Sequence, residues 1–282
     1  MCNNYKRSYF KPIQLLLEVI LINEAIYIFS SILNEGSFSM NSLFYNLLPH
    51  NWFVILYCVV YLISPYMNII LDKLNLKKLN GFIFLLFLVF SVYSYIVDFA
   101  GEIFDFSPVG LSSISMQGSI SGYTIVNFVL MYFLGAYIRK IDFSIKTYKL
   151  SLLLLLDIII IFISYLIAPK SATSYCSPFI VLEAVIIFLI FKNIKINANK
   201  TINFLAQGAF TVFLTHFYFL PYIKIEKFVN GNIFILFCHI LISSFAIYLC
   251  GWVIFVIYDS ITKPVYNLVN KKIKWLTFDV LK

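Results

Sequence analysis

Six ionisable side chains lie inside long apolar stretches of the sequence, where water is scarce. They are Glu18, Glu24, Asp157, Glu183, His216 and His239. A charged group at the centre of a membrane-spanning helix costs about 2.5 to 3.5 kcal/mol on insertion scales, so such a group normally faces a partner or a wet cavity. A histidine beside a carboxylate can act as a base with an orienting group. Acid-base chemistry is therefore the chemistry that these residue types predict.

The elements that must position these residues are membrane-spanning helices. The chain has 282 residues, of which 61% are hydrophobic and 12% charged, and its mean hydropathy is +0.91. One soluble core cannot bury so much apolar surface. Since a spanning helix needs about 20 largely apolar residues, the pattern predicts an all-α integral membrane protein. It would be a single domain over 1–282, with eight transmembrane helices at 13–33, 52–71, 81–97, 120–138, 150–168, 177–191, 202–223 and 232–258.

The basic residues alternate between the connections of these predicted spans. Alternate sides of the membrane would hold 18 and 3 of the 21 lysines and arginines. Because basic residues concentrate on the cytoplasmic side, both termini are predicted to be cytoplasmic, in the plasma membrane. The segment 261–282 is predicted to be a basic amphipathic tail along the inner leaflet. Anionic lipid, and not nucleic acid, is thus the expected partner of the net charge of +8.

This orientation places three of the titratable groups at one depth. Glu183 and His239 lie in the outer third of their predicted spans, and His216 lies about two thirds of the way out. The three form the predicted catalytic group. In a competing interpretation, each histidine hydrogen-bonds to a neighbouring helix and only fixes packing. Glu24 and Asp157 lie near mid-depth and are predicted to pair through a protonated member.

Other kinds of site are not supported by the sequence. The five cysteines contain no CxxC pair and there are only three histidines, so neither a disulfide framework nor a metal site is expected. The phosphate-binding, dinucleotide-binding, zinc-protease and serine-hydrolase motifs are absent from the sequence. The predicted chemistry is therefore acid-base or positional.

Four stretches, in order along the chain, resemble the bacterial acyltransferase 3 family of multi-pass O-acyltransferases that modify cell-surface polysaccharides. They are WFVILYCVVYLISPYMN from Trp52, GYTIVNFVLMYFLGAYIRK from Gly122, SPFIVLEAVIIFLIFK from Ser177 and FTVFLTHFYFLP from Phe210. The last resembles the family's tyrosine-leucine-x-histidine segment, with Phe213 in place of the tyrosine. The resemblance runs from about Lys6 to Tyr258.

This resemblance implies a donor, an acceptor and a division of roles. Acyl groups would arrive on cytoplasmic acyl-CoA, with acetyl-CoA as the family's expected donor. They would leave on a hydroxyl of a surface polysaccharide or its lipid-linked precursor, and polysaccharide-assembly proteins are candidate partners. Arg139 and Lys140 would meet the CoA phosphates, although they also fit as ordinary positive-inside charges. His216 and Glu183 would line the outer chamber.

The chain departs from the family pattern at its start. The family typically has ten spans and begins with an Arg-x10-His element that is usually assigned the catalytic base. Here Glu18 stands eleven residues after Arg7, and Leu150 stands eleven after Arg139. We therefore expect two N-terminal spans to be missing, and activity of this polypeptide alone stays open.

Two other classes of protein fit the same pattern of spans. One is a transporter or flippase for a lipid-linked sugar, which would move its substrate without consuming acyl-CoA. The other is a non-catalytic membrane subunit or remnant, which the missing spans would suggest and which would need a partner for stable insertion.

Overall fold

The computed structural model describes residues 6–33, 38–48, 51–106, 124–141, 145–195, 197–272 and 277–279. Apart from two three-residue strands, β1 (Lys6–Ser8) and β2 (Thr277–Asp279), which pair with each other, the described elements are helices. The chain divides into two compact units. The first unit comprises Met1–Arg7, Trp52–Lys195 and Phe278–Lys282, and the second comprises Ser8–Asn51 and Ile196–Thr277. That they act as one domain stays a prediction.

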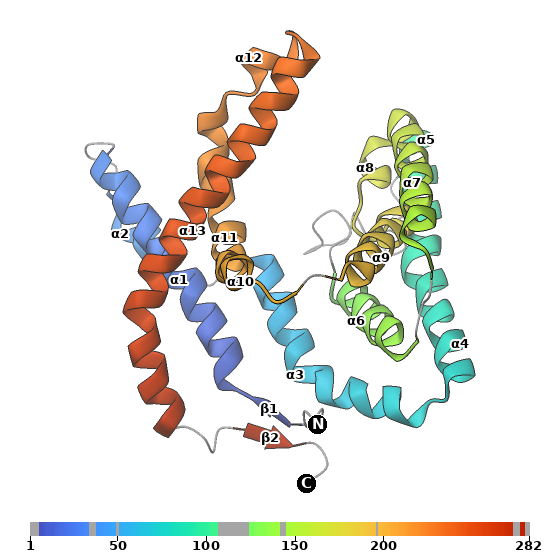
Figure 1. Cartoon of the computed structure of the whole chain (residues 1–282), viewed down its shortest axis with the longest axis horizontal. Helices are drawn as coiled ribbons and strands as arrows, with labels where there is room; N and C mark the ends of the chain where they lie inside the picture. The colour runs from blue at the N-terminus through green and yellow to red at the C-terminus, as the bar shows by residue number, and fades with distance from the viewer. Residues whose placement is uncertain are drawn as a thin grey trace. The chain divides into compact units, whose positions relative to one another are not determined.

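The first unit is built from the middle of the chain (Figure 1). Its helices are α3 (Trp52–Lys73), α4 (Leu76–Phe87), the π-helical turn η1 (Leu88–Tyr93), α5 (Ser94–Ile103), α6 (Ile125–Lys140), α7 (Thr147–Ile167), α8 (Pro169–Ala172) and α9 (Pro178–Asn193). Helix α6 packs against α3 and α4 around Met67, Leu79 and Phe133. Helices α7 and α9 pack against each other, and their core includes Leu150 and Ile186.

Local signals explain where several of these helices begin. The side chains of Asn75 and Thr124 accept hydrogen bonds from backbone N–H groups of the first turns of α4 and α6. Such caps satisfy donors that have no partner within the helix. Pro169 and Pro178 open α8 and α9, because the first helical position needs no N–H.

The second unit joins the beginning and the end of the chain. Its helices are α1 (Phe10–Leu33), α2 (Met40–Asn46), α10 (Lys200–Gln207), α11 (Ala209–Ile223), α12 (Glu226–Val229) and α13 (Ile233–Lys272). Helices α11 and α13 pack closely along their length. Gly251 of α13 permits this approach, since a Cβ atom there would lie 2.8 Å from Val212 Cα and 2.9 Å from Thr215 Oγ1.

Replacing Gly251 with alanine should therefore force α11 and α13 apart. We expect the substitution to lower the free energy of unfolding by about 1 to 3 kcal/mol, the usual cost of overpacking. Thermal and denaturant unfolding of the purified chain in detergent would measure it. Gly135→Ala in α6 is the matched control, because a Cβ atom there meets nothing within 4 Å. An equal loss in both variants would contradict the role given to the close crossing.

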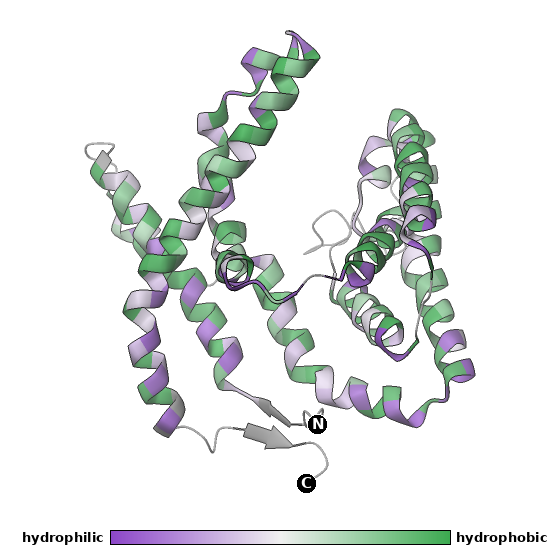
Figure 2. Ribbon diagram, viewed as in Figure 1, coloured by the Kyte–Doolittle hydropathy of each residue, from purple (hydrophilic) through white to green (hydrophobic). Residues whose placement is uncertain are grey.

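Five of the eight predicted spans coincide with helices long and apolar enough to cross a membrane. These helices cover Phe10–Ile32, Trp52–Lys73, Leu76–Ile103, Thr147–Ile167 and Ile233–Val269. Many of their apolar side chains point outward, for example Phe162 (60% exposed) and Leu166 (68% exposed). Figure 2 shows the same pattern, with hydrophobic residues along the helices and hydrophilic ones gathered mainly at their ends and turns. An integral membrane protein is what this surface requires.

The other three predicted spans differ in form. The span at 202–223 is α10 and α11, which meet at an angle of 52° beside Gly208. Those at 120–138 and 177–191 correspond to α6 and α9, each of 16 residues. An α-helix of that length is about 24 Å long, somewhat shorter than a bilayer core of about 30 Å.

The last predicted span ends at 258 and the predicted tail begins at 261, but the structure has one continuous helix across this boundary. Helix α13 continues past Tyr258 to Lys272, through Pro264. Beyond it Thr277–Asp279 is a strand, so the described part of the predicted tail is a helix followed by a strand.

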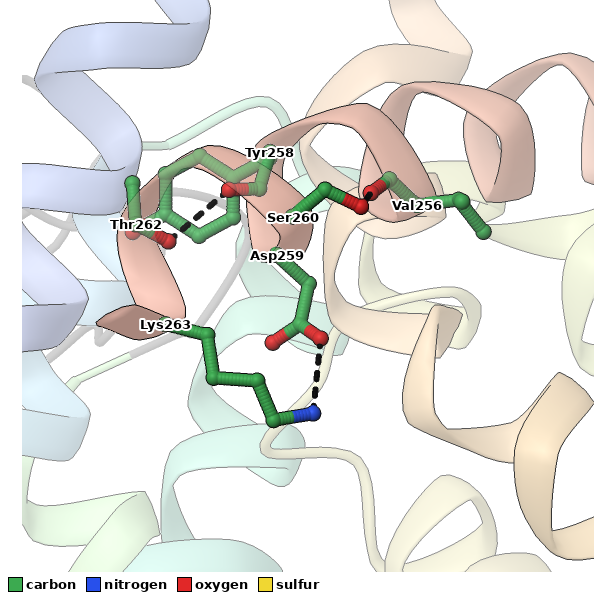
Figure 3. Close-up of polar contacts among 6 residues, drawn as sticks. All are labelled: Val256, Tyr258, Asp259, Ser260, Thr262 and Lys263. Carbon is green, nitrogen blue, oxygen red and sulfur yellow. Dashed lines mark hydrogen bonds and ion pairs between the residues drawn. The ribbon is translucent and has the colours of Figure 1, made fainter. Parts of the chain in front are cut away.

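Polar side chains support α13 just before the proline. Ser260 Oγ donates to Val256 O at 2.7 Å, and Thr262 Oγ1 donates to Tyr258 O at 2.9 Å (Figure 3). Lys263 pairs with Asp259 one turn earlier, at 3.0 Å. Proline supplies no N–H to the preceding turn, and these contacts add local bonds where the backbone pattern is interrupted.

Candidate functional site

His216 lies on α11 with one ring nitrogen engaged and the other available. Its Nδ1 is 2.6 Å from Phe213 O. A carbonyl oxygen only accepts hydrogen bonds, so Nδ1 is the donor, and in the neutral imidazole Nε2 has the lone pair. Among the described residues, no protein group bonds to Nε2. His216 is half-buried, and it has the tautomer that a general base needs.

Phe213 stands where the resembling segment of the family has a tyrosine, and this difference does not disturb the hydrogen bond of His216. The contact to His216 comes from the backbone carbonyl of Phe213, which any residue would supply. Aromatic rings flank the imidazole, with the Phe217 centroid at 4.1 Å and the Phe213 centroid at 5.8 Å. These rings restrict the orientation of the imidazole and leave it in apolar surroundings.

His239 lies on α13 beside the C-terminal end of α11. Its Nε2 donates to Ile223 O at 3.0 Å, and its ring stacks on Phe228 with centroids 3.9 Å apart. Ile223 ends α11, where backbone carbonyls lack partners within the helix. His239 thus ties the end of α11 to α13, as the packing interpretation of this residue expects.

Glu183 lies on α9 in the first unit, whereas both histidines belong to the second. Within its own unit, Glu183 acts electrostatically on Asp157 of α7. Asp157 is 3% exposed, and neither of its carboxylate oxygens has a hydrogen-bond partner. Asp157 belongs to the first unit and Glu24 to the second, so their predicted pairing stays a prediction. Glu24, on α1 of the second unit, also has two buried carboxylate oxygens without partners.

A polar contact between α1 and α11 was not foreseen from the sequence. Thr211 Oγ1 donates to Glu18 Oε1 at 2.9 Å, and Asp259 of α13 acts electrostatically on the same carboxylate. Tyr218 OH donates to Asn23 Oδ1 at 3.4 Å, two turns further along α11. The signal was the spacing of Thr211, Thr215 and Tyr218, which places three hydroxyls along one face of a helix.

The end of α6 carries the two residues predicted to meet CoA phosphates. Lys140 Nζ donates to Leu71 O and lies 3.9 Å from Asp72 Oδ1, so it joins the ends of α6 and α3. Arg139 is exposed, and it forms no hydrogen bond or ion pair within the described parts of the chain. Lys192 of α9 donates to Ile138 O at 3.1 Å. This end of the first unit is thus basic, with Arg139 available to an anionic ligand.

The connection between α7 and α9 is fixed by side chains from three other elements. Glu102 of α5 accepts from Ser171 N at 2.9 Å, from Ser171 Oγ at 2.7 Å and from Lys170 N at 3.0 Å. Ser91, in the π-helical turn, donates to Cys176 O at 2.7 Å. Asn127 of α6 donates to Tyr175 O, also at 2.7 Å. These bonds set the start of α9 and hence the place of Glu183.

No group of three or more His, Cys, Asp or Glu side chains within the described ranges is placed to hold a metal ion. Zinc sites in proteins normally use at least three such ligands. The second unit provides a half-buried imidazole, which suits acid-base chemistry, and the first unit provides a basic helix end, which suits anion binding.

Comparison with known protein families gives a match over most of the chain. The family model described as an acyltransferase domain, that of acyltransferase 3, matches residues 4–261. No curated protein matches the chain, and no solved structure does.

Proposed function

Because this chain belongs to the acyltransferase 3 family, we propose that it transfers an acyl group from cytoplasmic acyl-CoA to a hydroxyl of a cell-surface polysaccharide or its lipid-linked precursor. Acyl transfer itself follows from the family, and the observation that carries the proposal is the match over nearly the whole chain. Acetyl-CoA is the proposed donor. The long apolar helices agree with a reaction at or across a membrane.

The proposed topology has eight crossings with both termini in the cytoplasm. It counts α6 and α9 as short spans and the bent pair α10–α11 as one. This orientation is supported by the basic residues, because it places 18 of the 21 on the cytoplasmic side. Arg139 then faces the cytoplasm, where acyl-CoA is found, and His216 lies in the outer half of its span.

The proposed base is His216. Its Nε2 would take the proton of the acceptor hydroxyl while that oxygen attacks the thioester carbon. The C–O bond of the new ester forms and the C–S bond breaks. CoA leaves as a thiolate and gains one proton to become the thiol, which balances the proton lost by the hydroxyl. We propose Glu183 as a further group of the outer chamber, and His239 as a residue that positions the α11–α13 hairpin.

Arg139 is the proposed contact for the anionic phosphates of CoA. Its planar guanidinium can bind phosphate oxygens in a bidentate manner, and it has no competing ion pair within the described residues. Lys140 would add positive charge to the same helix end while it holds α6 to α3.

An assay in membrane vesicles separates this proposal from the transport alternative. Vesicles containing the protein would receive acetyl-CoA labelled in the acetyl group on their cytoplasmic side. We expect alkali-labile label in the polysaccharide or lipid-linked sugar fraction, with release of one CoA thiol per ester formed. Movement of a lipid-linked sugar with acetyl-CoA left intact would instead identify a transporter and overturn the proposal.

A further inference from the structure

We propose that helix α2 lies in the boundary between the lipid headgroups and the acyl chains, with its apolar face in the membrane, and that Tyr27 of α1 holds it there. The partner of this face is phospholipid. The inference goes beyond acyl transfer, since it concerns how the segment after α1 is attached to the membrane. It does not rest on the proposed function.

The exposed face of α2 is the first observation that supports this attachment. Met40, Phe44 and Leu47 are 56%, 59% and 46% exposed. Their spacing of four and three residues places them in one row along the helix. The polar residues Ser42 and Asn46 are less exposed than this row. A surface helix in water shows the opposite arrangement, with its polar side chains outward, so the pattern favours contact with lipid.

The shortness of α2 is the second observation. It has seven residues, none of them buried, and no side chain caps its first turn. An isolated helix this short is not stable in water, because its first turn fixes several residues for one hydrogen bond. In lipid, by contrast, a backbone group without a hydrogen-bond partner is very costly. The membrane boundary therefore stabilises the helical form that α2 adopts.

Tyr27 fixes the beginning of α2, which packs beside α1 (Figure 1). The Tyr27 hydroxyl donates to Ser39 O at 2.9 Å, and Ser39 N donates to the same hydroxyl at 2.6 Å. This hydroxyl thus uses both its donor and an acceptor site on one residue. The ring of Phe38 lies beside that of Tyr27, with centroids 6.0 Å apart. These contacts set the level of α2 along α1.

The lipid-facing surface of α1 continues onto α2. Helix α1 is long and apolar enough to cross a membrane, and Phe29 and Ile32 in its last turns are exposed. From Phe38 to Leu48 the sequence contains no charged residue. Tyr45 is also exposed, and tyrosine is enriched at the membrane–water interface. At about 10 Å, α2 is too short to cross a bilayer core of about 30 Å, which leaves a position along the surface.

Tryptophan fluorescence tests the proposal. In the full chain with its three native tryptophans replaced by phenylalanine, Phe44→Trp provides a reporter on the apolar face. The chain would be reconstituted in phosphatidylcholine vesicles whose acyl chains carry bromine, which quenches indole on contact, either near the headgroup or near the chain end. We expect bromine near the headgroup to lower the emission about twofold more than bromine near the chain end, because an interfacial helix inserts by only about 5 to 10 Å.

Two further reporters make the result specific. Leu47→Trp lies in the same row as Phe44 and should show the same pattern. Asn41→Trp is the matched control, because position 41 is exposed but lies outside the row. It should be quenched less by bromine and more by iodide in the water. Elution and unfolding temperatures close to those of the parent chain would show that each reporter is folded.

The outcome also identifies any other occupant of this face. Quenching of Phe44→Trp by iodide and not by brominated lipid would place α2 in water and overturn the proposal. Protection from both quenchers would also overturn it, since protein, such as a second copy of this chain, would then cover the face. Adding Tyr27→Phe removes both hydrogen bonds to Ser39 and should lower the quenching by lipid. Unchanged quenching would overturn the role given to Tyr27.

Discussion

Replacing His216 with glutamine is expected to lower the rate of acyl transfer by about 10² to 10⁴-fold, the usual contribution of a general base. Glutamine fills similar space but offers no basic nitrogen in place of Nε2. The loss should appear in kcat, with the KM for acetyl-CoA little changed, because the proposed role begins once the donor is bound. Initial rates of CoA thiol release at saturating acetyl-CoA would measure the effect.

His239→Gln is the matched control for this prediction. His239 bonds to Ile223 O and stacks on Phe228, so its loss should alter the stability of the hairpin more than the chemistry. Unfolding temperatures of both variants would show whether either is simply misfolded. A folded His216→Gln protein with the wild-type rate would remove His216 from the mechanism.

Replacing Arg139 with alanine is expected to weaken acyl-CoA binding by about ten- to a hundredfold, because a hydrogen bond to a charged group contributes about 1.5 to 3 kcal/mol. The KM for acetyl-CoA should rise while kcat at saturation changes little. Arg139→Lys should recover part of the affinity, since lysine keeps the charge but loses the bidentate geometry. Equilibrium binding of acetyl-CoA to the purified chain measures this directly.

Lys140→Ala separates the binding role from the structural one. Lys140 already holds the ends of α6 and α3 together through Leu71 O and Asp72. Its loss should lower the unfolding temperature more than the affinity for acetyl-CoA. Unchanged affinity in Arg139→Ala would contradict the proposed contact with the CoA phosphates.

Many of the helices could be predicted because the length of an apolar stretch can be read directly from the sequence. The helices that cover Trp52–Lys73 and Thr147–Ile167 lie within a few residues of the predicted spans. The acyltransferase 3 resemblance, predicted from Lys6 to Tyr258, is confirmed by the family match over residues 4–261. Membrane helices must satisfy their own backbone groups, and this constraint makes hydropathy a reliable guide to them.

The shapes of the helices were harder to predict. The bend between α10 and α11 and the shortness of α6 and α9 depend on how a chain enters and leaves the membrane, which hydropathy alone does not encode. Helix α13 continues through Pro264, although a proline usually ends or kinks a helix.

The residues of the candidate site could be predicted from their types, but their contacts with one another could be predicted only in part. The cost of burying a charge predicts that Asp157 and Glu183 need partners, and which groups they meet depends on how α7 packs against α9. The bond from Thr211 to Glu18 joins residues 193 positions apart, and no local pattern could have paired them. Depth in a membrane restricts which groups can meet, and helix packing then decides which ones do.

Reconstitution of the purified chain, alone, in lipid vesicles tests the central claim most directly. With acetyl-CoA on the Arg139 side and a polysaccharide or lipid-linked sugar acceptor on the other, CoA thiol and acetyl ester would be measured together over time. We predict equal amounts of both, with both lost in His216→Gln. Thiol release without ester, or no turnover by a folded and inserted chain, would contradict the assignment of this polypeptide as an O-acyltransferase acting on such acceptors.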